Sequence, residues 1–305
     1  MKRKVIIDTD PGHDDAMALM LAVKSEMFDV LAITTVCGNS TISNTTRNTR
    51  YIMNLLDKRQ VPIYSGAKKP IKRKLIKAVV HGKSGLVGID PKNRPQLTNN
   101  ASLKIIELVR DNPGVTIITL GPLTNIAQAI LMDPEAMSKV GEIVSMAGAI
   151  NVAGNKNRVA EFNVFVDPEA ADIVFRFTSK QTIVPLDPCN DISLELSDFK
   201  LIKNRKLRLD LLKMVKPYIQ NISLDEGVKV ALMYDPLTIF YVLYPEYCRS
   251  EVLNVVVETK GQFTRGMTVI DRRVNKDKIG TDIKIVTEIN GKYFIKTFIE
   301  MLSKE

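Results

Sequence analysis

The chain has 305 residues, of which 45% are hydrophobic, and its formal net charge is +9. This length is enough for a large buried core, and the sequence has no run of about 18 apolar residues, which argues against a membrane-spanning helix. The three cysteines are odd in number and lack metal-ligand spacing, so we expect a reduced, cytoplasmic protein. The opening MKRKVIIDTDPG is charged like a signal peptide, but its apolar run meets acids after Ile7, so we expect no signal peptide.

Strand-like segments alternate with helical segments along most of the chain. The first predicted strand is followed by a helix that is apolar on nearly all sides and is therefore expected to be buried. The predicted pairs, in chain order, are Lys4–Asp8 and Asp14–Lys24, then Val30–Val36 and Ser43–Lys58. They are followed by the helix Ser102–Asp111, strand Val115–Leu120, helix Leu123–Leu131, strand Glu142–Met146, helix Pro168–Phe177 and strand Thr182–Pro185. After residue 195 the chain is more helical, with late strands at Val252–Glu258 and Ile283–Glu288 that form a hairpin or an edge.

This alternation predicts an α/β fold with an open, mostly parallel central sheet flanked by helices. No repeat or long linker divides the chain, so we expect a single domain over residues 1–305. Ligands of such sheets bind outside the carboxyl ends of the strands. Polar residues and glycines follow four predicted strands, at Asp8 and Asp10, Gly38-Asn39, Gly121 and Ala147-Gly148.

The positive charge is concentrated in residues 68–77. A basic run of this kind is found in proteins that bind nucleic acid or anionic surfaces. Stacking on single strands requires interleaved aromatic residues, and this run has none. We therefore expect a solvated loop and no nucleic-acid partner. The basic residues are Lys68, Lys69, Lys72, Arg73, Lys74 and Lys77.

The segment VIIDTDPGHDDAMALMLA, residues 5–22, places four aspartates between two apolar runs. Capping of a helix N-terminus accounts for Asp14 or Asp15, at about 0.3–1 kcal/mol each, but not for Asp8 and Asp10 as well. Two carboxylates about 4 Å apart repel by about 4 kcal/mol at an effective dielectric of about 20, and a cation removes that cost. Oxygen ligands select Ca²⁺ or Mg²⁺. A metal there would activate a water or chelate a diol, with Asp10 as a candidate proton acceptor.

An apolar strand followed by Asp8-Thr9-Asp10 also resembles the start of the haloacid-dehalogenase-type phosphatases. In that pattern the first aspartate is phosphorylated, and Thr or Val stands two residues after the second. Gly12 occupies that position here, which argues against this interpretation.

The sequence DTDPGHDDAMALMLA closely resembles the opening signature of the inosine/uridine-preferring nucleoside hydrolases. Five further segments resemble blocks of the same family, in the same order, and with the first they span residue 4 to about 245. They are VCGN (36–39), VHGKSGLVG (80–88), LGPLTNIAQAI (120–130), MAGAINVAGNKNRVAEFNVFVDPEAADIVF (146–175) and YDPLTIFYVL (234–243).

The resemblance implies hydrolysis of the N-glycosidic bond of ribonucleosides to ribose and free base, a bound Ca²⁺, and a homodimer or homotetramer. It implies that Asp10 is the general base for a calcium-bound water and that Asp8 orients the site. An oxocarbenium-like transition state fits such acidic surroundings. The implied metal ligands are Asp10, Asp15, Asp235 and the backbone carbonyl of Leu120. The implied ribose contacts are Asp14 and Asp235 on the 2′- and 3′-hydroxyls, Asn39, Asn155, Glu161 and Asn163 on the others, and Met146 beside the sugar.

Several of these residues also have ordinary structural interpretations. Asn39 and Asn155 are typical of turns, Asp235 is typical of a helix cap, and Met146 is typical of a core. Glu161 and Asn163 flank one residue, so in an extended segment they share a face.

Activation of the leaving base is where the sequence departs from the family. Many members carry His immediately before the last metal aspartate, and this chain has Tyr234 there. A tyrosine hydroxyl can donate a hydrogen bond or a proton. His81 matches the loop near the base and is the second candidate, although Gly82, Gly85 and Gly88 also suit a polar hinge of a lid. Another branch uses tryptophans around purines, and this chain has no Trp.

Base preference therefore stays open, with an inclination to a broad or purine-tolerant enzyme. Tyr218 and Tyr241 are candidates to line the base pocket. One alternative is hydrolysis of another N-riboside, such as ribosylnicotinamide. The other is a protein that binds nucleosides or ribose without turnover.

Overall fold

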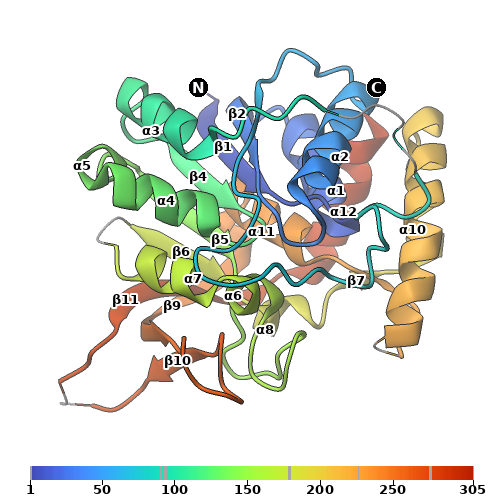
Figure 1. The fold of residues 1–305 in the computed structure, drawn as a ribbon. Coiled ribbons are helices and arrows are strands. Elements are labelled where there is room, and N and C mark those ends of the chain that lie inside the picture. The colour runs from blue at the N-terminus through green and yellow to red at the C-terminus, as the bar shows by residue number, and fades with distance from the viewer. Residues whose placement is uncertain are drawn as a thin grey trace.

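A nine-stranded sheet forms the centre of the molecule in the computed structural model, which describes residues 2–89, 91, 95–177, 180–225, 227–274 and 277–304 (Figure 1). The strand order is β10-β9-β11-β6-β5-β4-β1-β2-β3, and β7 and β8 form a separate pair. The strands are β1 (Arg3–Thr9), β2 (Phe28–Thr35), β3 (Ile63–Ser65), β4 (Thr116–Thr119), β5 (Glu142–Met146), β6 (Gln181–Val184), β7 (Ser193–Leu194), β8 (Ala231–Leu232), β9 (Cys248–Val257), β10 (Thr268–Asp271) and β11 (Thr281–Ile289).

Helices cover both faces of this sheet because alternate residues of each central strand point to opposite sides. In β1, Val5 and Ile7 enter one core, and Ile6 enters the other. The first core packs against α1 (His13–Lys24), α2 (Ile42–Leu55), α8 (Leu186–Cys189), α9 (Leu196–Phe199), α10 (Arg205–Asp225), α11 (Tyr234–Leu243) and α12 (Gly291–Ser303). The second packs against α3 (Ala101–Asp111), α4 (Thr124–Met132), α5 (Pro134–Met137) and α7 (Pro168–Phe175), as Figure 1 shows.

The order of the strands reverses between β1 and β4. The strand β1 pairs in parallel with both β2 and β4, and the chain proceeds outward to β3 on one side and through β5 to β6 on the other. A switch point of this kind leaves a crevice at the carboxyl ends of the two strands. Asp8 and Asp10 lie at that end of β1, so the fold places the acidic segment at the crevice.

The predicted open, mostly parallel sheet flanked by helices is confirmed. Six strands run parallel from β3 to β6, β11 pairs in parallel with β6, and β9 and β10 are antiparallel. The helix expected to reach Lys58 ends at Leu55, and the short edge strand β3 was not predicted.

The late strands were expected to form a hairpin or an edge; β9 and β11 do pair antiparallel, but they are not the edge of the sheet. The segment Ile283–Glu288 lies in β11, which is inside the sheet between β6 and β9, and β10 forms the edge. Neighbours in a sheet are chosen by long-range packing, which strand propensity does not encode. None of the helices in the described ranges is long and apolar enough to cross a membrane.

Candidate active site

Asp10 lies in a cradle made by glycines at the ends of β2 and β4. Its Oδ2 accepts a hydrogen bond of 2.6 Å from the backbone N–H of Asn39. A Cβ at Gly38 would lie 2.1 Å from Oδ2, and one at Gly121 would lie 2.3 Å from Oδ1. Any side chain at either glycine would collide with this carboxylate. The two glycines therefore allow Asp10 to be completely buried beside both neighbouring strands.

Asp15 is held by four donors at the N-terminus of α1. Its Oδ1 accepts from the Thr9 hydroxyl at 2.6 Å and from the backbone N–H of Asp10 at 3.1 Å. Its Oδ2 accepts from the backbone N–H of Gly12 and the amide of Asn39, both at 3.0 Å. This arrangement is a helix cap, as expected for one of the two adjacent acids, and it also fixes where the carboxylate points.

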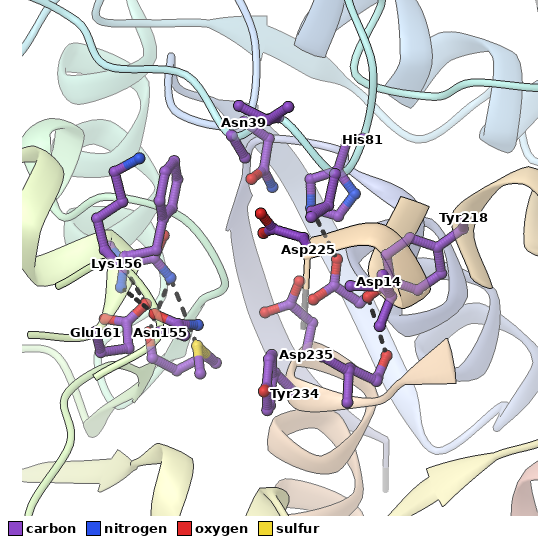
Figure 2. Close-up of a pocket in the computed structure, with 18 of the residues that line it drawn as sticks. Asp14, Asn39, His81, Asn155, Lys156, Glu161, Tyr218, Asp225, Tyr234 and Asp235 are labelled. Carbon is purple, nitrogen blue, oxygen red and sulfur yellow. Dashed lines mark hydrogen bonds and ion pairs between the residues drawn. The ribbon is translucent and has the colours of Figure 1, made fainter. Parts of the chain in front are cut away.

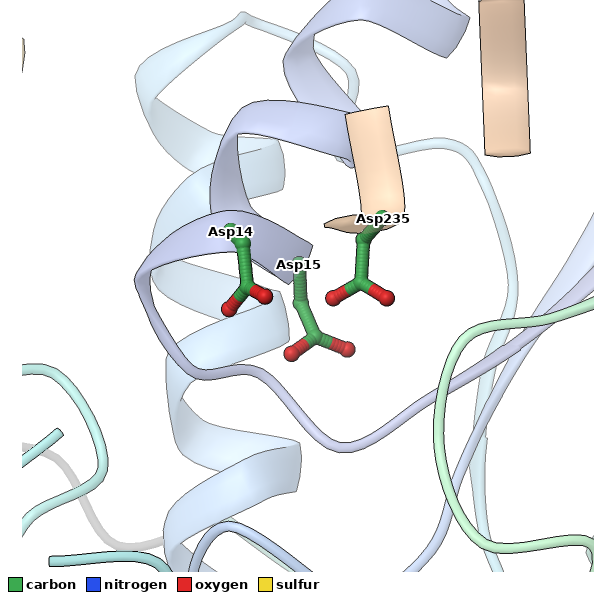
Figure 3. Close-up of side chains that lie close together, drawn as sticks. All are labelled: Asp14, Asp15 and Asp235. Atoms are coloured by element: carbon green, nitrogen blue, oxygen red, sulfur yellow. The ribbon is translucent and has the colours of Figure 1, made fainter. Parts of the chain in front are cut away.

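Three carboxylates gather where the N-termini of α1 and α11 meet. Oxygen atoms of Asp14, Asp15 and Asp235 all lie within 4.8 Å of one another, and all three side chains are buried (Figure 3). The helix α1 packs against α11, which brings Asp235 to residues far from it in sequence. Asp10 does not belong to this group of three, although its charge acts on Asp235.

Burial and the negative charges of neighbouring acids disfavour the ionised form of these carboxyl groups. Burial, followed by the charge of Asp15, raises the pKa of Asp14 to about 8. Burial and neighbouring aspartates raise the pKa values of Asp10 and Asp235 well above the usual range. Asp10 Oδ1 and Asp14 Oδ1 are buried and have no hydrogen-bond partner among the described residues. Buried, unpartnered carboxylate oxygens close together fit a hard divalent cation.

Asp8 lies behind this group. Its Oδ1 accepts from the Thr34 hydroxyl at 2.5 Å and from the Asn125 amide at 2.8 Å, and burial raises its pKa to about 7. This side chain is completely buried and does not line the cavity.

A cavity of about 240 Å³ opens next to the carboxylates (Figure 2). Ten of the residues predicted for the site line it, whereas Asp10 and Asp15 are buried behind its wall. The ten are Asp14, Asn39, His81, Leu120, Met146, Asn155, Glu161, Asn163, Tyr234 and Asp235. Of the two further candidates for the base pocket, Tyr218 also lines the cavity and Tyr241 does not.

The cavity wall formed by residues after β5 is held in place by hydrogen bonds with the backbone. Glu161 caps α6 (Phe162–Val166), accepting from the backbone N–H groups of Asn163, Val164 and Gly148, and burial raises its pKa to about 7. Asn163 Nδ2 donates to the carbonyls of Leu120 at 2.8 Å and Met146 at 3.1 Å. With its amide nitrogen used in this way, the Asn163 oxygen is the group available to a ligand.

His81 forms the opposite wall together with two other rings. Its ring stacks near His13 and Tyr218, with both centroids 5.4 Å away, and its Nε2 lies 3.7 Å from Asp14 Oδ1. His13 Nε2 lies 2.9 Å from the Val87 carbonyl, which makes it the donor and the ring the Nε2–H tautomer. Burial lowers the pKa of both histidines, that of His13 to about 4. The wall is therefore a stack of neutral rings suited to a flat, uncharged base.

Tyr234, at the start of α11, lies in the cavity wall beside Asp235 (Figure 2). Its hydroxyl donates to Asn190 Oδ1 over 3.4 Å.

The sequence prediction assigned no role to His13 and did not include Lys156, Phe162 or Asp225, which also line the cavity or support its wall. Lys156 and Phe162 adjoin the predicted residues Asn155 and Glu161 in the chain, whereas the contacts of His13 with His81 and Tyr218 are long-range.

The basic run has the expected exposed lysines, at Lys68, Lys69, Lys72, Lys74 and Lys77. Arg73 differs, since it is partly buried and bonds to both oxygens of Glu169 and to the carbonyl of Thr259. This contact anchors the run across α7, and the segment that follows it, residues 78–81, lines the cavity.

The fold and the site together define a class: an α/β protein with a mostly parallel sheet and buried carboxylates suited to a metal, beside a cavity with one polar and one aromatic wall. The model of the inosine-uridine preferring nucleoside hydrolase family matches residues 5–296, and the chain belongs to this family. It is an enzyme of the N-glycosyl hydrolase type that acts on ribonucleosides.

Known proteins of this family are similar over nearly the whole chain. The pyrimidine-specific ribonucleoside hydrolase RihA of Shewanella woodyi is 40% identical over 281 residues, which cover 89% of each chain. The solved structure of a plant nucleoside hydrolase, PpNRh1, has a TM-score of 0.94 at 28% identity and covers 100% of both chains. A purine-preferring ribonucleoside hydrolase from Gardnerella vaginalis has a TM-score of 0.89 at 27% identity, with 99% of this chain and 98% of that one covered.

Proposed function

We propose that the enzyme hydrolyses ribonucleosides to ribose and free base at this cavity, with Asp10 as the general base and Ca²⁺ as cofactor. The observation that carries the proposal is the set of buried carboxylates with unpartnered oxygens at Asp10 and Asp14. Ribose offers a vicinal diol, and the cation that these oxygens favour has room in its coordination shell for that diol.

The proposed metal ligands are Asp10, Asp15, Asp235 and the carbonyl of Leu120. Asp15 and Asp235 belong to the cluster of three carboxylates. The Leu120 oxygen accepts one hydrogen bond from Asn163 and keeps a second lone pair. A divalent cation in this position supplies positive charge that lowers the pKa of a water and keeps the carboxylates ionised.

The remaining catalytic and binding roles are assigned to side chains of the site. Asp10 Oδ1, which has no partner, accepts the proton of the attacking water. Asp14 and Asp235 bind the 2′- and 3′-hydroxyls, and Asn39, Asn155, Glu161 and Asn163 bind the rest of the sugar, with Met146 packing beside it. The acids around the ring stabilise the positive charge that grows on ribose as the C1′–N bond breaks.

The leaving base is proposed to lie between His81 and Tyr234, and either side chain would donate a hydrogen bond to its departing nitrogen, Tyr234 by turning its single O–H proton away from Asn190. We propose a broad base range that includes purines. The chain is similar both to enzymes named pyrimidine-specific and to one named purine-preferring, which supports a substrate range that includes both classes of base. A homodimer or homotetramer in the cytoplasm remains part of this proposal.

The test is release of reducing sugar from inosine, adenosine, guanosine, uridine and cytidine, with and without EDTA, for the native enzyme and Asp10→Ala. Ribose from at least one nucleoside, lost with EDTA and in the variant, is expected. Ribosylnicotinamide in the same panel tests the other N-riboside. No ribose from any of the five nucleosides would contradict the proposed substrate class.

A further inference from the structure

A second cavity, of about 360 Å³, lies beside the basic run of residues 68–77 and shares no lining residue with the active-site cavity. Four of the side chains that line it are cationic, and none of its described lining residues is an acid. The proposed function gives the basic run no role. The four cationic residues are Lys72, Arg73, Lys74 and Arg265, and the space between them is called the basic cavity below.

The position of Arg265 is fixed by the turn between β9 and β10. Its N–H donates to the carbonyl of Gly261 at 3.1 Å, and its carbonyl accepts from Asn157 Nδ2 at 3.3 Å. The next residue, Gly266, has a φ of +80°, and a Cβ there would lie 2.7 Å from the Cα of Phe165. This close approach requires glycine. It brings the Arg265 guanidinium over the Phe165 ring, 4.2 Å from the ring centroid.

Arg73 is held between the basic run and α7. It donates to both carboxylate oxygens of Glu169, at 2.7 and 3.0 Å, and to the carbonyl of Thr259 at 2.6 Å. The N–H of Ile71 donates to Asp167, the cap of α7, at 2.9 Å. These contacts hold the run along α7 (Figure 1), so the basic cavity is formed without a ligand.

The positive charges at the basic cavity exceed the negative charge that the chain supplies. Within the described ranges, Glu169 is the one carboxylate that forms an ion pair with any of the four cationic side chains. Arg265 Nε is buried and has no hydrogen-bond partner there. Burial, followed by the charge of Arg73, lowers the pKa of Arg265, as expected for two guanidinium groups close to each other. An anion would supply both the missing charge and the missing acceptor.

We propose that the basic cavity binds a small phosphate-bearing anion, either inorganic phosphate or a phosphate monoester, at a site separate from the active site. Phosphate oxygens accept charge-assisted hydrogen bonds from ammonium groups, and a guanidinium can donate two of them in parallel. The apolar side chains of Ile76 and Phe165 also line the cavity and suit the organic group of a monoester. This inference does not depend on which nucleoside the enzyme hydrolyses.

A small anion fits these observations better than a nucleic acid does. The cationic side chains surround a cavity, whereas a nucleic-acid surface presents them along a stripe or helix. The basic run also has no interleaved aromatic residue on which bases could stack.

The experiment measures the binding of inorganic phosphate and of glycerol 3-phosphate by isothermal titration calorimetry, at an ionic strength kept constant with NaCl. It uses enzyme saturated with Ca²⁺ and then freed of excess ion. The native enzyme is compared with Lys72→Met/Lys74→Met and with Arg265→Met. The control is Lys68→Met/Lys69→Met, which removes the same charge from exposed lysines of the same run that do not line the basic cavity. Thermal melting checks that each protein is folded.

We expect saturable binding by the native enzyme and by the control pair. The dissociation constant should be at least about tenfold larger in each cavity variant, because charge-assisted hydrogen bonds are lost. The ligand with the smaller constant identifies the source of the phosphate group. If Arg265→Met does not fold, the pair Lys72→Met/Lys74→Met decides, since these exposed side chains form no hydrogen bond or ion pair with the described residues.

Three results would overturn the inference. The first is no saturable binding of either ligand, and the second is binding that the cavity variants leave unchanged. The third is equal weakening in the control pair, which would indicate general attraction to the basic run. Binding of a single-stranded RNA oligonucleotide without binding of either phosphate would also contradict it. A second readout is thermal melting: phosphate should raise the melting temperature of the native enzyme more than NaCl of equal ionic strength, and Lys72→Met/Lys74→Met should lose this difference.

Discussion

The carboxylates and the aromatic rings of the site, called here the carboxylate wall and the aromatic wall, are built in different ways. The carboxylates come from the end of β1 and from the first turns of α1 and α11, and Asp15 alone accepts four hydrogen bonds. The aromatic side comes from the irregular segment that carries His81 and from the long helix α10 that carries Tyr218. The carboxylates are thus fixed by hydrogen bonds at the first turns of helices, whereas the aromatic rings depend on packing between an irregular segment and a distant helix.

The carboxylate wall should be the part that tolerates change least. Asp10→Ala removes the proposed proton acceptor, and we expect kcat to fall by about 1,000-fold or more with the fold retained. Steady-state kinetics with circular dichroism measures both. Asp225→Asn, at an exposed acid of the same cavity, is the control and should keep most of the activity. Full activity in Asp10→Ala would remove the general-base assignment.

The second prediction probes the same wall from the side of the substrate. A 2′-deoxyribonucleoside lacks one oxygen of the diol, so the carboxylates and the cation lose a partner. We expect kcat/KM to be about 100-fold lower for 2′-deoxyinosine than for inosine. Equal rates would contradict binding of the diol at Asp14 and Asp235.

Changes on the aromatic wall should be smaller and should depend on the base. His81→Ala is expected to reduce kcat/KM about tenfold, because one hydrogen bond and one ring of the stack are lost. Tyr234→Phe removes a single hydroxyl and should have a weaker effect. Purine and pyrimidine nucleosides are compared in parallel for both variants. An identical loss for every base would mean that this wall does not contact the base.

The smallest expected effect is on stability, and it depends on pH. Burial raises the pKa values of Asp8 and Glu161 to about 7. In the unfolded chain both titrate at about 4. Between about pH 4 and about pH 7, the metal-free folded state therefore binds more protons at these two groups than the unfolded chain does. The contribution of this difference to the free energy of unfolding is lost as the pH rises through about 7. Thermal melting in EDTA and in Ca²⁺ at about pH 5 and about pH 8 measures this.

Because a cation offsets carboxylate charge, the increase in melting temperature on adding Ca²⁺ should be larger at the higher pH. Other titrating groups contribute equally with and without the ion, so the difference isolates the site. The proposed ligands Asp10, Asp15 and Asp235 also have raised pKa values, so an increase that is the same at both pH values, or no increase at all, would count against a cation held by these three acids.

Much of the carboxylate wall could be predicted from the sequence because its parts are local. Asp8, Asp10, Asp14 and Asp15 lie within eight positions, and a strand, a turn and a helix N-terminus fix their relative places. The glycines after β2 and β4 also followed from the strand predictions. Their function as a cradle for Asp10 became clear only when the strands were placed side by side, since sequence does not state which strands are neighbours.

The sequence offered His81 and Tyr218 as separate candidates for the base pocket, but it did not predict that they stack together with His13 or that Lys156 lines the cavity. His13 stacks on Tyr218 with the two centroids 4.7 Å apart, although the residues belong to α1 and α10. Nothing in the neighbourhood of either residue indicates the other. Lys156 lies in a turn that resembles any polar loop, and only the backbone path of residues 154–160 directs it to the cavity.

The sequence by itself determined the class of fold, the acidic segment and its likeness to one family, because hydrophobic period, turn residues and close acids act over a few positions. Tertiary structure alone decided that Asp10 lies behind the cavity wall, that His13 stacks with Tyr218 and His81, and that β11 lies inside the sheet. These features depend on contacts between distant segments. Such contacts are selected by burial over the whole molecule and leave no local mark in the chain.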